Sequence, residues 1–163
     1  MYGLGSENAN LPGYVVLCPG RPVRFSILWT SAFLPPQHSG TYVNHSTIDP
    51  EKMIPFLSNK SGSLSQQRRQ LDLVRSLNDS RRDAKGSNPI LDARIDAMET
   101  AFRMQTSASQ AFNIGLETKE CRAEYGEGHF ANGCLLARRL VERGVRFVQV
   151  YYGNGQPWDT HEG

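Results

Sequence analysis

The stretch that decides the fold reads Val145-Arg146-Phe147-Val148-Gln149-Val150-Tyr151-Tyr152. It is an apolar, β-branched and aromatic run of the kind that forms strands. The residues before it, 129–143, have the spacing of an amphipathic helix, and its apolar stripe is expected to be Phe130, Cys134, Ala137 and Val141. Gly144 follows the last turn, where a left-handed residue is favoured. A helix joined by one glycine to an apolar strand is half of an α/β unit, so the sequence predicts an α/β fold.

Length and composition limit the class of protein. The chain has 163 residues, 39% of them hydrophobic, and a formal net charge of +2, which fits about one folded domain rather than a disordered chain. So small a charge does not favour a nucleic-acid or membrane-surface partner. No apolar run approaches the ~18 residues that a membrane span needs, and the first residues show no secretory signal. Three widely spaced cysteines favour idle thiols over a disulfide framework or a metal site.

Three parts follow one another along the chain. Residues 1–62 are loop-rich, with one predicted strand over 13–18 that ends at Pro19-Gly20. Residues 63–125 read as a helical insertion. Ser63 and Gln66 form a capping-box pattern at its start, and residues 86–89 break it into two helices that we expect to pair as an antiparallel hairpin. The second helix has an expected apolar stripe of Leu91, Ile95, Met98, Phe102, Gln105 and Phe112. A short third helix is expected over 117–125, and residues 129–163 supply a helix, a strand and a site loop.

The candidate chemistry lies in the loop after the last strand. In open α/β sheets, ligands bind beyond the carboxyl ends of the strands. Asp159 and His161 are two residues apart there, so an extended backbone would point both side chains to one side. A carboxylate and an imidazole together begin a site for zinc or a similar divalent ion, although such a site needs at least three protein ligands. The alternative is an ordinary solvated loop.

The other histidines are weaker candidates. His38 and His45 lie in the loop-rich part and are expected on the surface, and His129 is expected to cap the helix that it begins. The basic residues of 60–85 are read as a solvated helix face, because no aromatic residues interleave with them to stack on bases.

Six blocks of the sequence resemble one known family. In order, they are YGLGSEN at 2–8, LPGYVVL at 11–17, QRRQLDL at 67–73, AFRMQ at 101–105, ARRLVERGVRFVQV at 137–150 and GQPWDTH at 155–161. The family that they resemble is a sulfatase-like conserved domain of uncharacterised secreted bacterial proteins in the alkaline phosphatase superfamily. The resemblance implies a partial alkaline-phosphatase-like sheet with an inserted helical hairpin. It also implies that the chain is an internal fragment of one such domain, and that the longer protein is periplasmic or secreted.

The same resemblance implies a function for the longer protein. It would be a metal-dependent hydrolase of small sulfate or phosphate esters, with Asp159 and His161 as ligands of zinc or calcium and with Asn154 and Gln156 near the substrate. The nucleophile and most metal ligands would lie outside the chain, so no catalytic residue is assigned and the fragment itself is expected to be inactive. Since a fold does not fix a function, a non-catalytic binding or structural protein remains the alternative. A free-standing helical interaction module centred on 63–143 is a third interpretation, which would leave both apolar strands unpaired.

Overall fold

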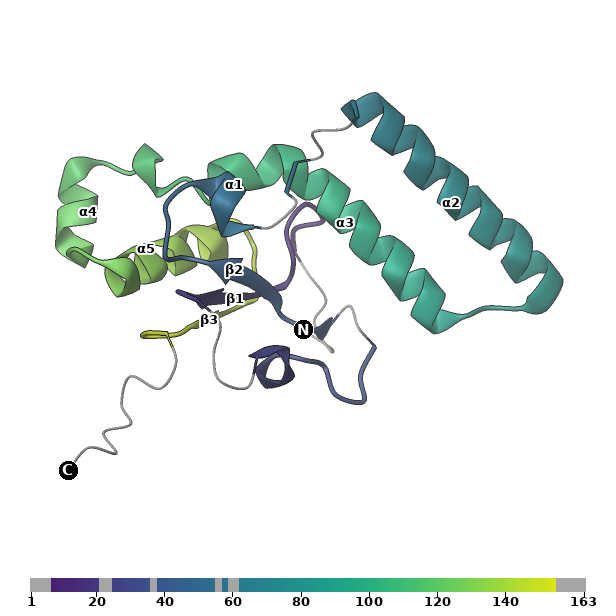
Figure 1. Cartoon of the computed structure of the whole chain (residues 1–163), viewed down its shortest axis with the longest axis horizontal. Helices are drawn as coiled ribbons and strands as arrows, with labels where there is room; N and C mark the ends of the chain where they lie inside the picture. Colours follow the sequence, from purple (N-terminus) through teal and green to yellow (C-terminus); the bar gives the residue numbers. More distant parts are fainter. Residues whose placement is uncertain (1–6, 21–24, 36–37, 55–56, 59–61, 155–163) are drawn as a thin grey trace.

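The computed structural model of the chain describes residues 7–20, 25–35, 38–54, 57–58 and 62–154. Within these residues the fold is mixed α/β, built around a three-stranded parallel sheet (Figure 1). The strands are β1 (Tyr14–Cys18), β2 (Thr41–Asn44) and β3 (Phe147–Val150), in the spatial order β2-β1-β3. The α/β class predicted from the sequence is confirmed, but three strands do not confirm the alkaline-phosphatase-like sheet that the resemblance implied.

β1 is the central strand because its sequence suits burial on both faces. Four consecutive residues, Val15 to Cys18, are fully buried, as is typical of parallel strands covered on each side. Val15 lies opposite Thr41 of β2 and Val148 of β3. Both predicted strands are therefore confirmed. β2 was missed: the described part of residues 1–62 contains two strands instead of the expected one.

Helices pack against the sheet and extend beyond it. They are α1 (Pro50–Met53), α2 (Leu64–Lys85), α3 (Pro89–Ala111), α4 (Lys119–Tyr125) and α5 (His129–Glu142), with short 3₁₀ turns η1 (Phe25–Leu28) and η3 (Ile114–Leu116). The capping box of Ser63 and Gln66 forms as predicted. α2 and α3 form the expected hairpin, which projects away from the sheet as a long arm (Figure 1). None of the helices in the described ranges is both long and apolar enough to span a membrane.

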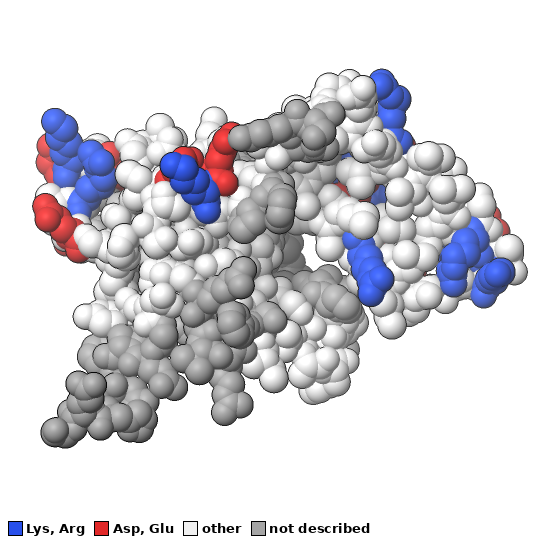
Figure 2. All heavy atoms as spheres, in the orientation of Figure 1, with Lys and Arg blue, Asp and Glu red and all other residues white. Residues whose placement is uncertain are grey.

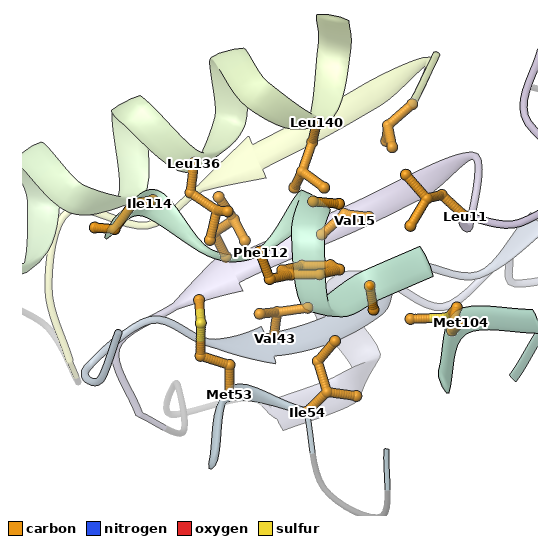
Figure 3. Packing of buried hydrophobic residues seen from close by; sticks show 14 of the residues in the cluster. Leu11, Val15, Val43, Met53, Ile54, Met104, Phe112, Ile114, Leu136 and Leu140 are labelled. Atoms are coloured by element: carbon orange, nitrogen blue, oxygen red, sulfur yellow. The ribbon is translucent and has the colours of Figure 1, made fainter. Parts of the chain in front are cut away.

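The core lies where α5 and the end of α3 cover one face of the sheet. Figure 3 shows Phe112 lying among Val43, Leu136 and Leu140 at the centre of this layer. Phe112 is fully buried, although α3 ends one residue earlier, at Ala111. The helix is followed at once by a large aromatic side chain that anchors it to the sheet.

Two predicted apolar stripes are wrong in detail. On α5, Phe130 and Val141 are exposed, and the buried face carries Leu135, Leu136 and Leu140. The predicted stripe was rotated by about one residue, or ~100°, because it gave a cysteine and an alanine the same weight as leucines. On α3, Met98 is 51% exposed.

Candidate functional site

The carboxyl ends of the three strands meet at one edge of the sheet, because the strands are parallel. Past the strand ends, the backbone N–H of Tyr151 donates to the carbonyl oxygen of Leu17 at 2.8 Å, and that of His45 donates to the carbonyl oxygen of Cys18 at 3.4 Å. The side chain of Asn154 lies against Gly20, where a Cβ atom would come within 2.7 Å of it. A side chain at position 20 would therefore displace Asn154 from this edge.

Helix α5 begins at the same edge. The ring of Phe130, in its first turn, lies 5.1 Å from the ring of Tyr152, measured between centroids. The residue before the helix is Gly128, at φ 97°, and no side chain caps the helix there. The prediction that His129 caps α5 is wrong, since His129 is already the first helical residue. The first-turn N–H groups, which carry the partial positive charge of a helix start, thus lie at the sheet edge without a side-chain acceptor among the described residues.

His45 is the unexpected group at this edge. The sequence placed it on the surface, but its side chain is 1% exposed, and neither ring nitrogen has a hydrogen-bond partner within the described residues. Burial, reinforced by the electrostatic interaction with His129, lowers the pKa of His45 to about 4. The imidazole is therefore neutral at pH 7. A buried polar group without a partner costs about 1–3 kcal/mol, so His45 marks a locally unfavourable arrangement of the kind that is enriched at functional sites.

Gly133 explains how His45 comes to be buried. A Cβ atom at position 133 would lie 3.0 Å from the imidazole ring of His45 and 3.2 Å from the side chain of Val150. The absence of a side chain lets α5 approach the ends of β2 and β3 closely, and this approach covers the imidazole. A glycine inside an amphipathic helix was the one sequence signal that could have pointed to this contact.

Of the predicted site residues, one lies within the described residues and three lie outside them. Asn154 lies at the sheet edge, as expected for a residue following β3. Gln156, Asp159 and His161 lie outside the described residues. Within the described part of the chain, no group of three or more His, Cys, Asp or Glu side chains is arranged to hold a metal ion.

A second polar cluster lies away from this edge and joins three helical segments. Arg138 and Arg139 of α5 both bind the carboxylate of Glu117, and Arg139, which is 3% exposed, also donates to the backbone carbonyls of Gln110 and Ala111 at the end of α3. Burial alone would raise the pKa of Glu117, but the hydrogen bonds from the two arginines outweigh it and lower the pKa. Both carboxylate oxygens of Glu117 are bound by arginines of α5. We therefore interpret the cluster as structural: it holds the end of α3 against α5.

Comparison with known proteins identifies a family without assigning a reaction. A family model described as a protein of unknown function (DUF1501) matches residues 1–163. No curated protein and no solved structure matches the chain. The resemblance to a sulfatase-like family of the alkaline phosphatase superfamily is therefore wrong: the family that covers the whole chain is one of unknown function, and no sulfatase or alkaline phosphatase family matches.

Proposed function

The chain belongs to the DUF1501 family of proteins of unknown function, and we propose that its sheet edge is part of a metal-dependent site that hydrolyses small sulfate or phosphate esters. The observation that carries the proposal is His45, a buried neutral imidazole without a partner in the described residues, at the carboxyl edge of a parallel sheet.

The edge suits an anionic substrate. Ligands of open α/β sheets bind beyond the carboxyl ends of the strands, and an uncapped helix start favours phosphate or sulfate through its N–H groups and dipole. α5 provides such a start. The amide of Asn154 lies at the same edge and could donate to an ester oxygen, and Gln156 follows it closely in the sequence.

The metal ligands would come from two segments. Asp159 and His161 provide two ligands in our proposal, and His45, whose neutral imidazole is the form that binds metals, provides a third. Asp159 lies nine positions after Val150, the end of β3. An extended chain of that length reaches ~30 Å, whereas the ends of β3 and β2 are two strand spacings, ~10 Å, apart. The reach is sufficient, and a site with two histidines favours zinc over calcium.

A divalent ion bound there would polarise the ester oxygens and lower the pKa of an attacking group. The residues of this chain would orient the ester through Asn154 and Gln156 and exclude water through the apolar layer under His45. No residue of the chain is assigned as the nucleophile. A relation of these three strands to an alkaline-phosphatase-like sheet stays a prediction.

The test measures zinc binding and ester hydrolysis in the longest protein that contains this chain. We expect Asp159→Asn, His161→Ala and His45→Gln each to lower both zinc content, measured by mass spectrometry of dialysed protein, and the hydrolysis of aryl sulfate or aryl phosphate. Thr160→Ala is the matched control, because in an extended segment its side chain points to the opposite side. Unchanged zinc content and activity in the Asp159→Asn, His161→Ala double variant would refute the proposal. Unchanged zinc content and activity in His45→Gln would show only that His45 is not a ligand.

The exposed apolar surface of the α2–α3 arm favours the alternative function, that of a binding or structural protein. Its exposed leucines (Leu73 and Leu77 among them) have no role in ester hydrolysis. A protein that lacks zinc and esterase activity but still associates through this arm would support that alternative.

A further inference from the structure

The α2–α3 arm has two sides of different chemistry. On one side the helices are joined by polar contacts: Arg68 binds the carboxylate of Glu99 at 2.5 Å, Arg75 approaches the same carboxylate at 3.7 Å, and the amide of Asn78 donates to Asp92 at 2.7 Å. Because Glu99 is nearly buried, this side is saturated by interactions within the arm.

The other side is apolar and open. Leu73 and Leu77 are 60% and 62% exposed. A groove of about 200 Å³ runs beside them between the two helices, lined by Val74, Leu77, Asn78, Arg81, Leu91 and Ile95. In the view of Figure 2, uncharged atoms cover much of the arm, with basic groups near its free end. Two leucines of this exposure on one helix face, next to an apolar groove, form a surface that association would stabilise.

The spacing on this side of α2 is that of a helix-pairing seam. Six exposed and uncharged residues recur at intervals of four and three: Gln66, Gln70, Leu73, Leu77, Ser80 and Ala84. This heptad spacing keeps one stripe facing a partner helix along its whole length. The stripe that packs on α3 is a different one, which contains Leu71 and Asn78, so the seam is not used within the arm.

We propose that this seam binds the same seam of a second copy of the chain, with the two α2 helices antiparallel, so that two arms form a four-helix bundle. In a symmetric dimer, contacts are reciprocal. Antiparallel pairing about the middle of the seam places Leu73 of each copy on Leu77 of the other. Gln70 then faces Ser80, and Gln66 faces Ala84. The proposal is independent of the proposed ester hydrolysis.

The charges beside the seam favour a second copy of the chain as the partner and determine the direction in which the two helices pair. Arg69 and Asp83 are exposed on one flank, and neither takes part in an ion pair within the described part of the chain. In the antiparallel dimer, Arg69 of each copy meets Asp83 of the other, giving two opposite-charge pairs. In a parallel dimer this flank of one helix would face the opposite flank of its partner, so Arg69 would lie beside Val74 and would not meet Asp83. The flank charges therefore pair only in the antiparallel direction.

The first experiment measures self-association of the chain by sedimentation equilibrium over a range of protein concentrations. We expect a reversible shift from the 18.2 kDa monomer towards twice that mass. The double variant Leu73→Glu, Leu77→Glu should remain monomeric. Leu116→Glu is the matched control, because Leu116 is a leucine of similar exposure, 61%, on η3, and it should associate as the unmodified chain does.

The second experiment tests the pairing itself by charge reversal. Arg69→Asp makes both flank positions acidic, and Asp83→Arg makes both basic, so each variant alone should associate at least tenfold more weakly than the unmodified chain. An equimolar mixture of the two should associate again, because every flank contact then joins opposite charges. Far-UV circular dichroism verifies that each variant keeps its helix content. A monomeric unmodified chain, dimers that survive Leu73→Glu, Leu77→Glu, or a mixture no stronger than its components would each overturn the proposal.

Discussion

Replacing Phe112 by alanine tests whether the core is centred where α3 meets the sheet. Phe112 is fully buried among Val43, Leu136 and Leu140 (Figure 3). A buried phenylalanine removes roughly 150–250 Å² from water, which at ~25 cal/mol per Å² corresponds to about 4–6 kcal/mol. Measured Phe→Ala costs in cores are about 3–5 kcal/mol, and we expect Phe112→Ala to lower the free energy of unfolding by that amount.

Phe102→Ala provides the comparison, because the sequence placed both rings on one stripe. The structure separates them: Phe102 is only partly buried, and its ring lies 5.2 Å from the guanidinium carbon of Arg68. We expect Phe102→Ala to cost about 1–2 kcal/mol. Phe33→Ala, at a ring that is 93% exposed, should cost less than ~0.5 kcal/mol.

Urea unfolding followed by far-UV circular dichroism measures these differences. With a denaturant slope of about 1–3 kcal/mol/M, the midpoint should fall by more than ~1 M for Phe112→Ala and by clearly less for Phe102→Ala. If Phe112→Ala leaves too little folded protein to measure, Phe112→Leu keeps most of the volume and should cost about 1–1.5 kcal/mol. A Phe102→Ala cost equal to or above that of Phe112→Ala would refute the assignment of the core.

Two further predictions concern the sheet edge. The pKa of His45 is lowered to about 4 in the folded chain, against ~6.5 when unfolded, so its contribution to stability is complete above about pH 6.5 and is lost as the pH falls towards 4. Between pH 7 and pH 5 the free energy of unfolding should fall by about 2 kcal/mol more than in His45→Gln, and parallel urea titrations that show equal losses in both proteins would contradict this. Gly133→Ala should destabilise the fold by about 1 kcal/mol or more despite the ~1 kcal/mol gained from alanine's helix propensity, because its Cβ would press on the imidazole of His45 at 3.0 Å. Ser76→Ala, on the exposed face of α2, should have no such cost, and a stabilised Gly133→Ala variant would show that α5 has room to move.

The elements that were predicted correctly are those whose signals are local. The run 14–18 is β-branched and bounded by turn residues, and it became β1. The capping box at Ser63 needs only residues three positions apart, and it formed. Gly144, at φ 85°, ends α5 where the left-handed conformation was expected. In each case the physical cause lies within one or two turns of chain, so a single sequence is sufficient to reveal it.

The elements that were missed depend on contacts between distant segments. β2 is four residues long, and Val43 is its only buried side chain, so its strand character comes from pairing with β1 more than from its own composition. The orientation of α5 was likewise set by which leucines the sheet could accommodate, a choice that the helical period alone leaves open by one residue. The sequence alone would place Arg139 on the surface. It is only 3% exposed, because the end of α3 and Glu117 pack around it in the folded chain.

The candidate site combines both kinds of information. The strand order places the ends of β1, β2 and β3 together, which the predicted α/β unit anticipated for β3 alone. His45 reaches this edge through β2, the strand that the sequence did not reveal, and it is covered by α5 only because position 133 is glycine. We propose that Asp159 and His161 bind a metal ion together with His45, a neutral histidine without a partner in the described residues that follows the strand two places from β3. In that proposed site, the parallel order β2-β1-β3 places His45 at the sheet edge where β3 also ends, and its pKa of about 4 means that one ring nitrogen is free of a proton at neutral pH.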